Sequence, residues 1–149
     1  MKTEIFAQPV LIIGLELRTD NTVADKTIPV HWQQFYSQAV IEQIPNKISS
    51  DVYAIYTKYT NEGVDNTGTY SCVIGTAVSS LENLPSHLTA IFLPASSYQV
   101  VSVARGHPEL VSQAWQEIWQ QDITTRTFIA DFERYQADGK IDILLGVRS

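Results

Sequence analysis

Apolar and polar positions alternate along the first half of the chain in a way that predicts strands around one helix. Residues 4–18 form a long extended apolar run, in which Gly14 suggests a bulge or a close approach of another backbone. Residues 27–44 predict a helix that begins at a capping Thr and ends before a Pro. Residues 51–60 and 69–79 are aromatic and alternating, which is typical of strands. The predicted order is therefore β-α-β-β.

The second half of the chain repeats this order. Residues 88–104 are again a long extended segment, which Pro94 and Ser96-Ser97 interrupt. Residues 108–121 predict a helix with a Pro in its first turn. Two further strands are expected at residues 127–135 and 140–147, joined by an Asp-Gly hairpin turn. We therefore predict an α+β fold built from two tandem β-α-β-β modules.

Residues match between the halves as well as elements. A shift of 83 residues carries a group of helix residues from the first half onto the second: Trp32, Gln33, Phe35 and Tyr36 onto Trp115, Gln116, Ile118 and Trp119. A shift of 76 residues carries YAIYTKY, residues 53–59, onto IADFERY, residues 129–135. Two such modules, at about residues 1–82 and 83–149 of one domain spanning 1–149, are expected to pack as a pseudo-twofold pair with an antiparallel sheet and a cleft between the halves.

Composition and charge narrow the choice of partners. The 149 residues are 44% hydrophobic and 17% charged, as in a globular domain, and the formal net charge is −6. This acidic balance argues against direct binding of nucleic acid and suits a cationic partner better. The first residues show no signal-peptide pattern, and no window is long and apolar enough to span a membrane. We expect a cytoplasmic protein that does not bind membranes.

The strand at residues 127–135 contains the most informative charge, Glu133. Strict alternation places Phe132 on one face of this strand and Asp131, Glu133 and Tyr135 on the other, which favours Phe132 as a core residue. Periodicity alone favours a solvated face for Glu133 and Asp131. A carboxylate facing a covered surface would instead need a cationic partner.

Other reactive residue types give no recognisable site. His31, His87 and His107 are far apart and show no metal-ligand spacing, and Cys72 has no basic neighbour that would activate a thiol. The chain has no recognisable nucleophile elbow. We therefore expect no metal, no cofactor and no catalytic residue, although a Glu with a nearby Tyr leaves acid–base chemistry open.

The order of these motifs resembles the GyrI-like, or AraC-type, effector-binding domain. The likeness covers nearly the whole chain and depends on the duplicated β-α-β-β order together with the segments IPVHWQQFY, VIGTAV and FERY. Domains of this family are fused to multidrug-sensing transcription regulators or occur as stand-alone proteins. The chain resembles in particular the stand-alone drug-binding proteins carried on integron gene cassettes.

This resemblance implies a ligand site. In the family, ligands enter a cleft between the two modules, and an acidic residue in a late strand contacts cationic amphipathic drugs. The matching residue within FERY is Glu133. The aromatic residues available for the walls of the cleft are Trp115, Trp119, Trp32, Phe35, Tyr36 and Tyr135.

The resemblance also implies a role in sensing or sequestering cationic amphipathic molecules, linked to transcription regulation. A small-molecule hydrolase that uses Glu133 in the same cleft is an alternative, and so is a protein-binding factor like the gyrase-inhibiting relatives. A sensor would need a partner to read out binding, either a second copy in a homodimer or a regulator protein that the sequence does not identify.

Overall fold

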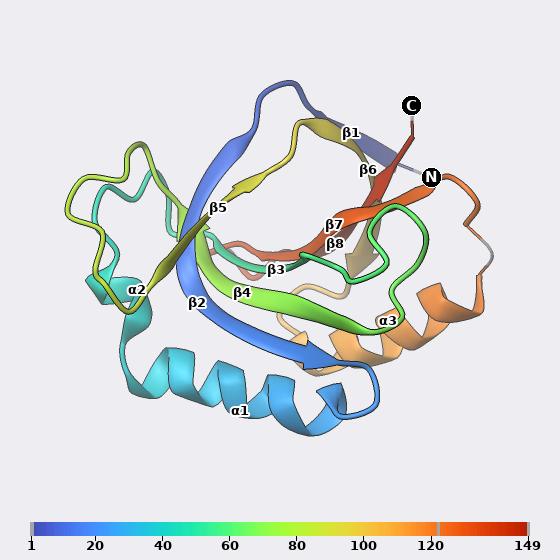
Figure 1. Ribbon diagram of the computed structural model, residues 1–149, viewed down its shortest axis with the longest axis horizontal. Helices are drawn as coiled ribbons and strands as arrows, with labels where there is room; N and C mark the ends of the chain where they lie inside the picture. Colours follow the sequence, from blue (N-terminus) through green and yellow to red (C-terminus); the bar gives the residue numbers. More distant parts are fainter. Residues whose placement is uncertain (1, 122, 149) are drawn as a thin grey trace.

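The computed structural model describes residues 2–121 and 123–148, and it has the predicted α+β architecture (Figure 1). The strands are β1 (Lys2–Phe6), β2 (Val10–Asp20), β3 (Val52–Thr57), β4 (Thr69–Ala77), β5 (Thr89–Leu93), β6 (Ser96–Val103), β7 (Arg126–Tyr135) and β8 (Ile141–Val147). The helices are α1 (Ala24–Ser37), the short α2 (Val40–Gln43) and α3 (Val111–Gln120), which follows a 3-10 turn at Pro108–Leu110.

All eight strands form one antiparallel sheet in the order β1-β6-β8-β7-β3-β4-β2-β5. The order is symmetric about the pairing of β3 with β7, where Val52 lies opposite Tyr135 and Thr57 opposite Ala130. From this central pair outward, one side continues as β8 and β6, and the other as β4 and β2. The two halves of the chain thus have the same strand order, as their sequence similarity predicts.

The first extended segment of each half is divided into two strands. In the second half the division falls at Pro94, between β5 and β6, where the sequence predicted an interruption. Residues 4–18, in contrast, were expected to be one strand, but the chain leaves the ladder before Pro9, which has no backbone N–H to donate. The short strand β1 then pairs with β6, in the other half, and β5 pairs with β2 in the same way. Arg134 of β7 reinforces this exchange by donating to both carboxylate oxygens of Glu4, at 2.8 and 3.0 Å.

The first helix also differs from its predicted bounds. It begins at Ala24, before the expected Thr27, and it ends at Ser37. Ala39 adopts a left-handed conformation with φ of 51°, which interrupts the helical path before α2. The predicted helix over residues 27–44 is therefore a helix, a break and a single further turn.

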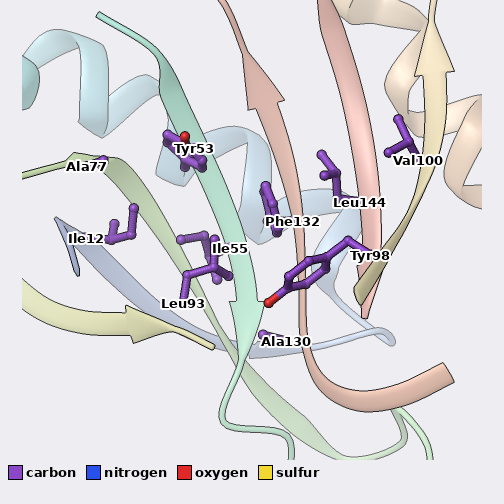
Figure 2. Close-up of a cluster of buried hydrophobic side chains, with 10 residues drawn as sticks. All are labelled: Ile12, Tyr53, Ile55, Ala77, Leu93, Tyr98, Val100, Ala130, Phe132 and Leu144. Atoms are coloured by element: carbon purple, nitrogen blue, oxygen red, sulfur yellow. The ribbon is translucent and has the colours of Figure 1, made fainter. Parts of the chain in front are cut away.

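Each face of the sheet is covered by a hydrophobic core. On one face Ile55, Phe132 and Leu144 pack with Tyr98 and Leu93, and Figure 2 shows these side chains gathered across the central strands. On the other face lie α1 and α3, below the sheet in Figure 1. Phe35 of α1 packs against β2, β3 and β4, and Ile118 of α3 packs against β8. Phe132 is a core residue, as the alternation predicts.

Two glycines allow the sheet to bend strongly between β2 and β4. Gly14 and Gly75 lie directly opposite each other in this ladder. A Cβ atom on Gly75 would lie 2.0 Å from the carbonyl oxygen of Ile13, and one on Gly14 would lie 2.4 Å from that of Ile74. Gly14 therefore permits the close backbone approach that the sequence suggested.

The register of β3 against β7 corrects the alignment of the two halves. Directly opposite residues of an antiparallel pair share a face, so Tyr56, which lies opposite Asp131, is on the same face as Glu133. Phe132 is on the other face. The shift of 76 residues, which matches Tyr56 with Phe132, is therefore wrong because it matches residues on opposite faces, whereas an odd shift such as 77, which matches Tyr56 with Glu133, keeps the faces.

Replacing Phe132 with Ala should lower the free energy of unfolding by about 3–5 kcal/mol, because the change leaves a cavity in a closed core. Phe132 is fully buried and its ring contacts those of Phe6, Tyr53 and Tyr98. Phe92, which is 65% exposed in β5, provides the matched control. Phe92→Ala should change stability by no more than about 0.5 kcal/mol in urea unfolding. Equal losses in the two variants would contradict this description of the core.

Candidate functional site

A cavity of about 530 Å³ lies between α1 and α3, over the central strands of the sheet. Its walls combine side chains from both helices with side chains from the helix-covered face of the sheet. From α1 these are Ala24, Asp25, Ile28, Pro29 and Trp32, and from the region of α3 they are Pro108, Glu109, Val111, Ser112, Trp115, Gln116 and Trp119. The sheet and its loops supply Asn21, Tyr56, Tyr59, Asn66, Tyr70, Arg126, Glu133 and Tyr135.

Glu133 lies at the inner end of this cavity and is only 2% exposed. Three aromatic side chains donate hydrogen bonds to its carboxylate. Oε2 accepts from the hydroxyl of Tyr56 at 2.6 Å and from Nε1 of Trp115 at 2.7 Å. Oε1 accepts from the hydroxyl of Tyr135 at 2.5 Å. The carboxylate is thus held by one residue from the neighbouring strand, one from α3 and one from its own strand.

Burial controls the protonation of this cluster. Removal of the Glu133 carboxylate from water raises its pKa, and the hydrogen bonds from Tyr135, Tyr56 and Trp115 oppose this rise only in part. The pKa values of Tyr56 and Tyr135 are also raised, first by burial and then by the neighbouring negative charge of Glu133. Both hydroxyls therefore remain protonated donors at neutral pH. No described Lys, Arg or His forms an ion pair with Glu133.

Asp131, two residues earlier on the same face of β7, has a different environment. Its Oδ2 accepts from Arg126 at 2.8 Å and from the hydroxyl of Tyr59 at 2.7 Å, and its Oδ1 accepts from the backbone N–H of Gly146 at 3.0 Å. The side chain is fully buried. The solvated position that periodicity favoured for Asp131 is therefore wrong, because the face is covered and an arginine compensates the charge.

Five of the seven residues expected at a ligand site line the cavity. They are Glu133, Trp115, Trp119, Trp32 and Tyr135. The ring of Trp32 meets that of Tyr135 edge-on, with centroids 5.3 Å apart, and Trp115 meets Tyr56 in the same way at 5.5 Å.

Phe35 and Tyr36 are not among the residues that line the cavity, which corrects the expectation that they form its walls. Phe35 is 1% exposed and packs in the core under α1. Tyr36 is 66% exposed and stacks on Trp32, with ring centroids 5.9 Å apart. The i, i+4 spacing correctly places Trp32 and Tyr36 together, but the rotation of α1 about its axis determines which of them reaches the cavity.

Several cavity residues were not identified from the sequence. Tyr56 could have been found by alternation along residues 51–60 combined with the correct shift between the halves. Tyr70 lines the cavity from β4, and burial raises its pKa to about 12. Arg126 gave no local signal, because its importance depends on its contact with Asp131. Asp25 and Glu109 are exposed acidic residues of the cavity wall.

His31 and Cys72 are buried residues whose contacts support the fold. Nε2 of His31 lies 2.8 Å from the carbonyl oxygen of Leu15 and 3.1 Å from that of Cys72, and burial lowers the pKa of this imidazole. The Cys72 thiol is fully buried, which raises its pKa and keeps it protonated. Within residues 2–121 and 123–148, no group of three or more His, Cys, Asp or Glu is arranged to hold a metal ion. No helix in that part of the chain is long and apolar enough to cross a membrane.

Comparison with known proteins adds a family to this geometry. The model of the family described as integron-associated effector binding protein matches residues 7–147. The chain is also 33% identical over 136 residues to YobU of Bacillus subtilis (strain 168), which is described as a candidate transcriptional regulator. This match covers 86% of the chain and 82% of YobU.

Several solved structures share the fold. An integron cassette protein of Vibrio cholerae is similar with a TM-score of 0.78 and 23% identity, over 99% of this chain and 95% of that one. SAV2435, solved in complex with tetraphenylphosphonium, gives a TM-score of 0.78 at 18% identity, over 99% of this chain and 93% of its own.

Replacing Glu133 with Gln should raise the free energy of unfolding at neutral pH. The pKa of Glu133 is raised above its ordinary value of 4.5 in the folded protein, so the carboxyl contributes stability below that value and loses it as the pH rises through the raised pKa. The amide carries no charge to desolvate, and its oxygen can still accept from Tyr56 and Trp115. Urea unfolding of both proteins across this pH range should therefore show a flatter profile for the variant.

Glu117→Gln is the control for this measurement. Glu117 is an exposed residue of α3, so removal of its charge should leave the dependence of stability on pH parallel to that of the unmodified protein. A Glu133→Gln variant that is less stable than the unmodified protein at neutral pH would show that the carboxylate supports the fold.

Proposed function

We propose that this chain, which belongs to the family of integron-associated effector-binding proteins, binds amphipathic organic cations in the cavity between α1 and α3. The observation that carries the proposal is the environment of Glu133. A carboxylate that is 2% exposed lies against an aromatic cavity and has no ion-pair partner among the described residues. A cationic effector would supply the missing counter-charge.

The energetic argument begins with the cost of burying Glu133. An ionised carboxylate in a poorly hydrated place is unfavourable without a positive partner, and hydrogen bonds from neutral donors compensate only part of that cost. Asp131 nearby has Arg126, whereas Glu133 has three neutral aromatic donors. The attraction of a ligand cation to Glu133 is therefore stronger than it would be at an exposed, solvated carboxylate.

The walls favour a large apolar cation over a small hydrated one. Apolar ligand surface that leaves water gains about 25 cal/mol per Å², and each aromatic face that contacts a cation adds roughly 0.5–2 kcal/mol. Trp32, Trp115, Trp119 and Tyr135 supply such rings. A volume of about 530 Å³ is within the range of small-molecule sites. Apolar burial sets the affinity, and Glu133 sets the selectivity for positive charge.

The charge around the cavity also favours a positively charged ligand. Asp25 and Glu109 are exposed wall residues, and the whole chain carries a formal net charge of −6. Such a field raises the local concentration of cations and the rate at which they enter. The structural neighbour SAV2435 was solved with tetraphenylphosphonium, which is a large apolar cation. That neighbour supports the proposal through its fold.

The biological role proposed for this binding is sensing or sequestration of such effectors, linked to transcription regulation. Sensing requires that bound ligand favours a second conformation or a surface that another molecule recognises. A homodimer or a separate regulator protein would provide that recognition. Hydrolysis remains the second candidate, because a Glu with a raised pKa beside tyrosine hydroxyls resembles an acid–base pair.

Glu133→Gln should weaken the binding of cationic amphipathic dyes at least tenfold, a loss of about 1.4 kcal/mol or more. A panel of cationic, neutral and anionic dyes is titrated into the protein while tryptophan fluorescence is followed, since Trp115 and Trp32 line the cavity. Neutral dyes should bind the variant and the unmodified protein similarly. Glu117→Gln removes the same charge from the exposed side of α3 and should leave all affinities unchanged.

Two results would reject this proposal. Equal affinity for cations and anions would remove the role of the carboxylate, and so would an unchanged affinity in Glu133→Gln. Chromatography of the recovered dye separates binding from turnover, because chemical conversion of an ester-containing dye would favour the hydrolase.

The affinity for a permanently charged cation should rise with pH through the raised pKa of Glu133. The cation stabilises the ionised carboxylate, so binding lowers the pKa of Glu133 and releases a proton when the free carboxyl is protonated. Well above this pKa the affinity should become independent of pH. Calorimetry in buffers of different ionisation enthalpy measures the released protons. Glu133→Gln should show neither effect, and a persistent pH dependence in that variant would assign it to another group.

A further inference from the structure

A second hollow of about 520 Å³ adjoins the aromatic cavity at the far end of α3. Four residues line both spaces, so the two meet at a junction formed by Asn21, Asn66, Trp119 and Arg126. Trp119 forms part of the wall at this junction and is 53% exposed. A ligand bound beside Glu133 could therefore extend past Trp119 into the second hollow.

Arg126 is a buried cation at this junction with unused hydrogen-bonding capacity. Its side chain is 8% exposed, its Nη2 donates to Asp131 at 2.8 Å, and its guanidinium lies over the ring of Phe128 at 4.2 Å from the centroid. Its Nε is buried and has no hydrogen-bond partner in the described part of the chain. A guanidinium carries five N–H donors, and a buried donor without an acceptor is costly. The junction therefore lacks an acceptor that a ligand could provide.

The charged residues of the two spaces change sign from one end to the other. Glu133, Asp25 and Glu109 line only the aromatic cavity, Arg126 lines both spaces at their junction, and Arg148 lines only the second hollow. Asp131, the partner of Arg126, lies two residues from Glu133 on the same strand face, which places their backbones about 6.5–7 Å apart. The guanidinium that pairs with Asp131 and the carboxylate of Glu133 line the same cavity, and these opposite charges suit a single molecule that carries both.

We propose that the effector is zwitterionic, with its cationic apolar part beside Glu133 and an anionic group, such as a carboxylate, at Arg126. This inference rests on the proposed function and names the ligand class more closely. A carboxylate can accept two parallel N–H bonds from a guanidinium, a geometry that an ester or a simple cation cannot supply equally well. Asp131 balances the charge of Arg126 within the protein, and the additional anion is also attracted by the exposed Arg148.

A matched pair of rhodamine dyes tests this inference. The two dyes share one xanthylium cation, and one carries a free carboxylate where the other carries its methyl ester. The unmodified protein should bind the free acid at least as tightly as the ester, despite the lower net charge of the acid. Absorbance confirms that the acid is in its open, coloured form. A tenfold preference for the ester in the unmodified protein would overturn the inference without any variant.

The variant R126Q/D131N removes the ion pair without leaving a buried charge uncompensated. The affinity for the free acid relative to that for the ester should fall at least fivefold, because the guanidinium that binds the carboxylate is gone. Circular dichroism and urea unfolding establish that the variant is folded. If it is not, R126K keeps the positive charge but loses the planar fork, and it should shift the ratio in the same direction. An unchanged ratio in a folded variant rejects the inference.

Two controls separate this inference from the proposed function. Glu133→Gln should weaken both dyes by the same factor and leave their ratio unchanged. Arg105→Gln removes an exposed arginine that pairs with Asp138 outside the joined spaces, and it should change neither affinity. If neither dye binds, the proposed function fails. If both bind and depend on Glu133 while the Arg126 variants leave the ratio unchanged, only the zwitterionic class is wrong.

Discussion

The hydrogen bonds from Tyr56, Trp115 and Tyr135 to the carboxylate of Glu133 are the interaction on which the rest of the site depends. They join β3, β7 and α3 at one point, next to the pairing through which the two halves of the sheet meet. Each donor is aromatic, so the same side chains that hold the carboxylate also form the apolar wall. The charge and the hydrophobic surface of the cavity cannot be positioned independently, because three residues supply both.

Two carboxylates on one strand face show how environment assigns different roles to the same chemistry. Asp131 is satisfied from within the protein by Arg126, Tyr59 and a backbone N–H. Glu133 has neutral donors and a raised pKa. The first completes an internal ion pair, and the second has no ion-pair partner among the described residues. The buried charge of Glu133 lowers the stability of the fold, whereas the charge of Asp131, two residues away, is compensated by an ion pair.

The sequence was sufficient to predict the β-α-β-β plan of each half and the two faces of β7. Alternation in residues 127–135 placed Phe132 in the core and grouped Glu133 with Tyr135, because a period of two is a property of the backbone. Alternation could not show that the face carrying Asp131 and Glu133 is also covered, so the solvated position favoured for Asp131 was wrong. Helices cover that face, and the sequence of a strand does not indicate what packs on it.

Other features of the site required three-dimensional structure. The helix pattern identified the aromatic residues of α1, but the rotation of α1 about its own axis places Phe35 in the core and Tyr36 in solvent. The pairing of Arg126 with Asp131 connects residues whose sequence context is unremarkable, and Tyr56 was assigned to the wrong counterpart by a shift of one residue.

The exchange of the first strands between the two halves also has a consequence for the order of folding. Lys2 pairs with Val100, so β1 is synthesised long before its partner emerges from the ribosome. The first half therefore emerges with β1 unpaired and one edge of β2 uncovered, and both pairings between the halves form only after the second half has been synthesised.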